Sequence, residues 1–80
     1  MEREKVYEVL TGVFRDVFFD DSIEINDATV AGDIDGWDSL MHITLIGAIE
    51  DEFEITIPMK DVVGMKNVGE MVDTIMELAD

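Results

Sequence analysis

The sequence contains no cysteine, which excludes disulfide bonds, thiolate metal ligands and any sulfur nucleophile among its own side chains. Thiol chemistry could enter this protein only on an added group. Histidine occurs once, and a lone imidazole beside an apolar stripe is far more often a packed residue than an acid or base, so we assign His42 no chemistry. With no nucleophile placed beside a base, the chain has no expected catalytic residues and is predicted not to be an enzyme.

Positive charge is scarce: 5 Lys and Arg residues stand against 20 Asp and Glu, and the net charge is -15. Phosphate backbones and anionic lipid surfaces would repel such a molecule, which argues against nucleic acid and against membrane insertion. Long apolar runs are absent too, and Met1–Lys5 lacks the cationic-then-apolar order of a secretory signal. We therefore expect a cytoplasmic protein whose partners carry basic patches.

The remaining composition is that of a folded domain. The 80 residues are 48% apolar and 31% charged, a balance unlike that of a disordered acidic tail. No composition shift and no Pro/Gly/Ser-rich stretch divides the chain. We expect a single domain, residues 1–80, with one hydrophobic core, and a monomer.

Hydrophobic periodicity predicts a first amphipathic helix from Glu2 to about Phe18. The pattern then fails between Phe19 and Trp37, where turn and cap residues predict a long loop. Loops of this length are uncommon in compact domains unless their own apolar residues hold them to the core. The residues expected to do so are Ile23, Ile25, Val30 and Ile34.

A second helix is predicted to follow Asp38, whose carboxylate can accept hydrogen bonds from the first-turn amides. It runs to Phe53, with a buried stripe. The acidic cluster Glu50–Glu52 opposes the dipole at its carboxyl end, so helix stability does not explain it. The stripe consists of His42, Leu45, Ile46, Ile49 and Phe53.

The rest of the chain is predicted to be extended from Glu54 to Pro58, with a short helical turn from Lys60 to Val63. A last helix begins at Asn67, where Glu70 suggests a reciprocal capping box. Its buried stripe is Val68, Met71, Val72, Ile75 and Leu78. These elements predict an all-α fold, an up-and-down bundle of three main helices plus one short helix, with the long loop between the first and second.

The segment Gly36-Trp37-Asp38-Ser39-Leu40, followed by an apolar helix, resembles the phosphopantetheine attachment motif of acyl and peptidyl carrier proteins. Further along the chain, Ala48–Phe53 and Ile57-Pro58 also resemble this family at matching spacing. The resemblance implies an up-and-down bundle that carries 4'-phosphopantetheine covalently on Ser39. It also implies that acyl or aminoacyl groups travel as thioesters on this arm between enzymes of fatty-acid, polyketide or related biosynthesis.

The partners implied by the resemblance are a phosphopantetheinyl transferase, acyl-activating and acyl-transferring enzymes, and ketosynthases. The transferase would supply the base and the magnesium and would use coenzyme A, because Ser39 has no activating base in its own chain. A phosphate attached to Ser39 would meet free backbone amides and the positive end of the helix dipole. The alternative is that Ser39 is an ordinary exposed serine in the first turn of a helix.

The expected partner-binding surface surrounds the start of the second helix. Leu40 and Ile43 follow a helical course beside Ser39, away from the buried stripe, and acidic residues ring them. The alternative is that Ile43 belongs to a wide buried stripe. The expected partner-binding residues are Asp35, Asp38, Leu40, Met41, Ile43, Glu50 and Asp51.

Several residues depart from the pattern of fatty-acid-synthesis carriers. Trp37, Met41 and Thr44 replace small, polar or acidic residues, and Lys60 lies in a region that is typically acidic, which favours a specialised carrier. Trp37 is expected to hold the loop to the bundle by burying its ring. Met59, Met65 and the methionines of the last helix suit a core that repacks around a variable guest, although ordinary core filling explains them equally well.

Two other classes were considered. A calcium-binding loop counted from Asp33 puts Trp37 at a ligand position and Thr44 where the bidentate glutamate belongs, so that hypothesis fails on spacing and no metal site is expected. An acidic electrostatic interaction module without a prosthetic group would need the charge but not Ser39. That second class remains the alternative function.

Overall fold

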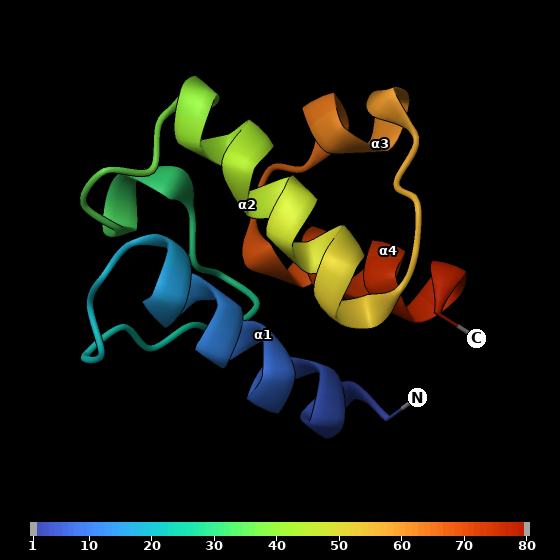
Figure 1. Cartoon of the computed structure of the whole chain (residues 1–80), viewed down its shortest axis with the longest axis horizontal. Helices are drawn as coiled ribbons and strands as arrows, with labels where there is room; N and C mark the ends of the chain where they lie inside the picture. Colours follow the sequence, from blue (N-terminus) through green and yellow to red (C-terminus); the bar gives the residue numbers. More distant parts are fainter. Residues whose placement is uncertain (1, 80) are drawn as a thin grey trace.

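The computed structural model describes residues 2–79, which form helices joined by loops without any strand (Figure 1). The main helices are α1 (Arg3–Val17), α2 (Ser39–Phe53) and α4 (Val68–Leu78), and α3 (Met59–Gly64) is short. In Figure 1, α2 runs between α1 and α3, and the long loop lies at the α1 side. The all-α prediction and the long first loop are confirmed. Across residues 2–79, none of the helices has the length and apolar character needed to cross a membrane.

One hydrophobic core joins the helices, because each presents an apolar stripe that only its neighbours can cover. α1 contributes Val6, Leu10 and Phe14, all fully buried. The predicted stripes of α2 and α4 are buried as expected, except that His42 and Leu78 are half-buried. The fully buried residues of these two helices are Leu45, Ile49, Val68, Met71, Val72 and Ile75.

The long loop is held to the core by side chains and, in part, by hydrogen bonds that the sequence did not predict. Ile23 and Ile34 are buried and Ile25 packs against the core, but the prediction for Val30 is wrong, since its side chain is 39% exposed. Val30 instead ends an extended stretch before a short 3-10 turn at Ala31–Asp33. The Asp33 carboxylate accepts the Val30 N–H at 3.0 Å, which fixes this turn.

The start of α4 is bonded to the same loop. The carbonyl oxygens of Thr29 and Asp27 accept the N–H groups of Val68 and Gly69 at 2.9 and 3.1 Å. These amides have no partner inside the helix, so the loop supplies one. A side chain on Gly69 would approach the Asp27 carbonyl oxygen to 3.0 Å, which explains a glycine at this contact.

Both predicted caps are made, one of them only in part. The Asp38 carboxylate accepts the Met41 N–H at 2.8 Å, and the Asn67 side-chain oxygen accepts the Glu70 N–H at 2.9 Å. Among the described residues, the reciprocal bond, in which the Asn67 N–H would donate to the Glu70 carboxylate, is not made. The reciprocal part of the capping-box prediction is therefore wrong.

The carboxyl end of α2 explains one residue of the acidic cluster. Glu54 has a left-handed backbone, with φ of 55°, so it ends the helix rather than starting the predicted extended segment. The chain then turns back, and the Glu50 carboxylate accepts the Ile57 N–H at 2.7 Å. Ile57 is buried, so Glu50 fastens the α2–α3 connection to the bundle.

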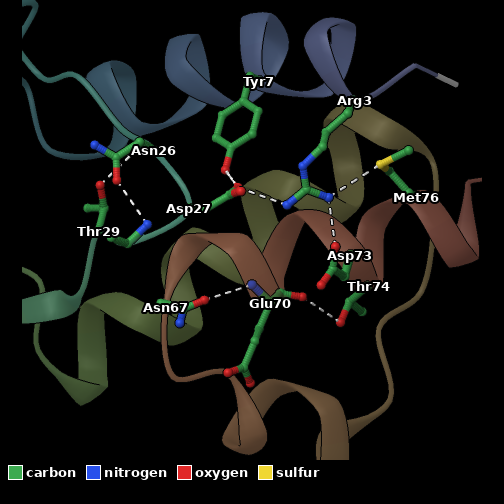
Figure 2. A network of polar contacts seen from close by, with 11 residues as sticks. Arg3, Tyr7, Asn26, Asp27, Thr29, Asn67, Glu70, Asp73, Thr74 and Met76 are labelled. Carbon is green, nitrogen blue, oxygen red and sulfur yellow. Dashed lines mark hydrogen bonds and ion pairs between the residues drawn. The ribbon is translucent and has the colours of Figure 1, made fainter.

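A polar network ties α1 to the long loop and to α4 (Figure 2). Arg3 forms ion pairs with Asp27 at 2.8 Å and with Asp73 at 2.7 Å. The Tyr7 hydroxyl donates a hydrogen bond to the Asp27 carboxylate. Three segments that are distant in sequence therefore meet at one guanidinium group.

Candidate functional site at the start of α2

Ser39 is the first residue of α2, and its side chain is exposed. The chain reaches it through a tight turn in which Gly36 has a φ of 87°, a conformation that favours glycine. The Trp37 N–H donates to the Ile34 carbonyl oxygen at 3.2 Å within this turn. The loop therefore presents Ser39 at the surface in a fixed position.

The backbone around Ser39 has the polarity of a helix start. The amides of Ser39 and Leu40 belong to the first turn, where no preceding helical carbonyl can accept them. Asp38 engages the next two amides: its carboxylate accepts from Met41 at 2.8 Å and its carbonyl from His42 at 2.8 Å. A phosphate on the Ser39 oxygen would lie at the positive end of the α2 dipole.

Trp37 packs between α1 and α2, as predicted. Its half-buried ring meets Phe14 edge-on at 5.2 Å between centroids and lies nearly parallel to the His42 ring at 5.9 Å. The indole N–H donates to His42 Nδ1 at 3.1 Å, and His42 Nε2 lies 3.1 Å from the carbonyl oxygen of Val62 in α3. His42 is therefore a packed residue that connects the loop to α3.

A cleft of about 410 Å³ opens directly beside Ser39. We call it the Ser39 cleft. Sequence reasoning missed it, because its walls come from the long loop, α2, α3 and the start of α4, and no single segment carries the pattern. Its lining is mostly apolar and consists of Ala31, Trp37, Asp38, Ser39, His42, Ile43, Val62, Val63, Met65, Lys66, Asn67 and Met71.

The methionines of the prediction lie in three places: Met65 and Met71 in the cleft, Met76 against the core, and Met59 at the surface. Met71 is fully buried, Met65 is half-buried, and both line the Ser39 cleft, where a flexible thioether can adapt to different contents. Met59 is 66% exposed, so the prediction that it fills the core is wrong. The reason is that Met59 begins α3, whose buried face is supplied by Val62.

The expected partner-binding residues fall into two groups. Leu40 is 77% exposed and Ile43 is 53% exposed, so Ile43 lies outside the buried stripe. Val63, 76% exposed on α3, adds an apolar side chain that sequence reasoning missed. The remaining exposed members of the expected set are Asp35, Asp38 and Asp51.

Met41 and Glu50 differ from that group because both are half-buried. The Glu50 carboxylate is committed to the Ile57 N–H, which gives it a structural role.

The pKa values of two side chains are shifted in the network of Figure 2. The Asp27 carboxylate accepts hydrogen bonds from Tyr7 and Arg3, which hold its pKa below the usual range. Desolvation of the Tyr7 hydroxyl, together with its hydrogen bond to Asp27, raises the pKa of Tyr7 to about 12. These groups connect α1, the loop and α4 and are not part of the Ser39 cleft.

Comparison with known proteins identifies the family. A family model described as "Phosphopantetheine attachment site" matches residues 8–75. Acyl carrier proteins of Clostridium perfringens, strains 13 and SM101, are 48% identical over 42 residues, which is 52% of this chain and 55% of each relative. The matched stretch thus spans about half the length of these relatives.

The fold agrees with that of a solved carrier. The solution structure of a holo acyl carrier protein from Geobacter metallireducens matches with a TM-score of 0.85 and 40% identity, over 91% of this chain and 84% of that one. The chain belongs to the phosphopantetheine attachment site family, so it is a carrier domain with a phosphopantetheine prosthetic group and not an enzyme.

Proposed function

We propose that Ser39 is the residue that bears 4'-phosphopantetheine, and that the chain carries acyl or aminoacyl groups as thioesters on this arm. The observation that carries the proposal is the exposed Ser39 side chain at the start of α2, beside a mostly apolar cleft. The intermediates would pass between enzymes of fatty-acid, polyketide or related biosynthesis. The arm would supply the thiol that a chain without cysteine lacks.

Attachment requires a transferase, because no side-chain base within residues 2–79 is hydrogen-bonded to the hydroxyl of Ser39. The serine oxygen forms a bond to the phosphorus that bears the pantetheine group of coenzyme A, and the pyrophosphate bond of coenzyme A breaks. Adenosine 3',5'-bisphosphate leaves, and the serine proton passes to a base on the transferase. The transferase also supplies the magnesium ion that neutralises the phosphates.

The residues around Ser39 suit such a group. The first-turn amides and the α2 dipole favour the phosphodiester. The apolar lining of the Ser39 cleft, with Ile43, Val62 and Met71, suits an aliphatic cargo held away from water. A cargo in the cleft would be shielded during transfer between enzymes.

Docking of partner enzymes is expected on the surface around Ser39. Exposed Leu40, Ile43 and Val63 provide apolar contacts, and Asp35, Asp38 and Asp51 provide negative charge. Such a surface favours fast and weak association with partners that carry basic patches. The transferase, acyl-activating and acyl-transferring enzymes and ketosynthases would all use this surface.

Met41, Thr44 and Lys60 depart from the pattern of fatty-acid-synthesis carriers, and this departure supports a role in a dedicated pathway.

The test is loading by a promiscuous phosphopantetheinyl transferase with coenzyme A and magnesium, followed by mass spectrometry. One arm should be added to the wild-type chain, and none to Ser39→Ala. Ser22→Ala is the matched control, since Ser22 is the other serine, also exposed, and its loss should leave loading intact. An unchanged wild-type mass would contradict the proposal.

The alternative is an acidic interaction module without an arm, which the net charge of -15 favours. A module of that kind would bind its basic partner equally well after Ser39→Ala. A carrier loses its role with the same substitution.

A further inference from the structure

The hydrogen bonds of His42 define its protonation state. An indole N–H can only donate and a carbonyl oxygen can only accept. Nδ1, at 3.1 Å from Trp37 Nε1, must therefore be unprotonated, and Nε2, at 3.1 Å from the Val62 oxygen, must carry the hydrogen. Both bonds exist together only in this neutral form of the imidazole.

The bond to Val62 holds a helix that has few other attachments. α3 has 6 residues and ends at Gly64, so the Val62 carbonyl is one of the last-turn acceptors without a partner inside the helix. The Val62 side chain is buried, but Met59 and Val63 of the same helix are 66% and 76% exposed. α3 is therefore held to the bundle largely by the side chain of Val62 and by the bond of its carbonyl to His42.

The bridge from Trp37 through His42 to Val62 forms part of the wall of the Ser39 cleft, since all three residues line it. Trp37 is fixed in turn by its edge-on contact with Phe14 of α1. The bridge thus joins a fixed wall of the cleft to α3. Its Trp37–His42 bond holds the loop wall of the cleft against α2, and its His42–Val62 bond holds α3 against α2.

We propose that His42 is a positioning residue for the carrier function: it holds the Ser39 cleft closed around its contents, and protonation of its imidazole releases the Trp37 wall of the cleft while the bond from Nε2 to Val62 stays. This inference rests on the proposed function of Ser39. A proton on Nδ1 would place an N–H against the Trp37 N–H, so that bond is lost and two donors oppose each other. The cleft would then widen, and a cargo inside it would become accessible to water and to partner enzymes.

Charged side chains lie on the elements around His42. Among the described residues, Asp38 at the start of α2 and Lys66 between α3 and α4 line the cleft with it. The Asp38 carboxylate accepts the Met41 N–H at 2.8 Å, and Asp61 precedes Val62 on α3.

The first experiment uses the unmodified chain, in which Trp37 is the only tryptophan and His42 the only histidine. Nitrogen-15 NMR of the imidazole at about pH 8 should show a hydrogen on Nε2 alone. Lowering the pH to about 5.5 should change the Trp37 emission in one step and remove the protection of its indole N–H from exchange. In His42→Gln the amide can accept from Trp37 and donate to Val62 without titrating, so the emission should stay flat.

The second experiment measures access to the cleft. The chain is loaded with an octanoyl group from octanoyl-coenzyme A by the transferase, and cleavage of the thioester by hydroxylamine is timed. His42→Phe, which keeps the stacked ring but removes both hydrogen bonds, should be cleaved several-fold faster than wild type, and His42→Gln at the wild-type rate. Circular dichroism checks that each variant is folded.

The proposal is overturned by a hydrogen on Nδ1 at neutral pH, by identical emission profiles of wild type and His42→Gln, or by equal cleavage of all three proteins. A chain that cannot be loaded would contradict the assignment of Ser39 instead. The first experiment would still decide the role of His42 in that case, because it needs no arm.

Discussion

The role of an individual residue in this protein depends on which of its polar groups are already hydrogen-bonded within the fold. Ser39 is exposed at the first position of α2, directly after Asp38, whose carboxylate accepts the Met41 N–H at 2.8 Å and caps the helix. Glu50 belongs to an acidic cluster in the sequence, yet its carboxylate is bound to the Ile57 N–H at 2.7 Å. Asp38 and Glu50 thus serve the fold, whereas the Ser39 side chain stays at the surface.

Tyr7 offers a direct test of the network in Figure 2, because it is the only tyrosine and its ionisation can be followed alone by ultraviolet absorbance. The pKa of Tyr7 should be about 12 in the folded protein. Folding favours the protonated phenol, so this contribution to stability is present below the ordinary pKa of about 10 and is lost as the pH rises through the folded value.

Substitution of the partner of Tyr7 should weaken this effect. Asp27→Asn removes the negative charge that opposes ionisation of Tyr7, and the pKa of Tyr7 should fall toward its ordinary value, although desolvation keeps part of the shift. Asp16→Asn, on the exposed side of α1, serves as a control and should leave the titration curve in place. Equal curves for Asp27→Asn and wild type would show that the network does not form in solution.

At the scale of the helices, substitutions at two glycines distinguish the effect of helix propensity on stability from the effect of a tertiary contact. A side chain at Gly12 in α1 would meet nothing within 4 Å, whereas one at Gly69 in α4 would lie 3.0 Å from the Asp27 carbonyl oxygen. Gly12→Ala should therefore stabilise the protein by about 0.5 to 1 kcal/mol. Gly69→Ala should destabilise it, because the bonds from the loop to α4 must shift. Urea unfolding measures both, and equal changes would contradict this account.

The carboxyl end of α2 provides a second matched pair. Glu50→Ala should lower the free energy of unfolding by about 1 to 3 kcal/mol, because the Ile57 N–H loses its partner in a partly buried connection. Glu52→Ala removes an exposed acid that opposes the helix dipole, so stability should stay equal or rise by about 0.5 kcal/mol. Thermal unfolding of the two variants tests this, and an equal loss in both would remove the assigned role of Glu50.

At the scale of the whole molecule, the net charge of -15 is expected to lower the stability of the folded state through repulsion between acidic groups. The molecule has a radius of gyration of 11.3 Å, comparable with the screening length of about 10 Å at 0.1 M salt, so most acidic groups repel one another at low salt. The melting temperature should rise with sodium chloride, and more steeply with magnesium or calcium chloride. A melting temperature independent of salt would show that self-repulsion does not limit stability.

The sequence by itself determined the helices, the caps and the position of Ser39. The reason is that each of these features depends on residues close together in the sequence. Examples are the apolar stripe of α4, the cap residues Asp38 and Asn67, and the motif around Ser39. The all-α bundle followed, because amphipathic helices can bury their stripes only against one another.

Only the tertiary structure decided which side chains meet across the chain. Val30 is apolar in the sequence but faces solvent, because backbone bonds from the loop to α4 already fix that segment. The Ser39 cleft and the bridge from Trp37 through His42 to Val62 combine residues from three or more segments. Contacts of this kind depend on the packing of distant elements, and sequence periodicity carries information about one element at a time.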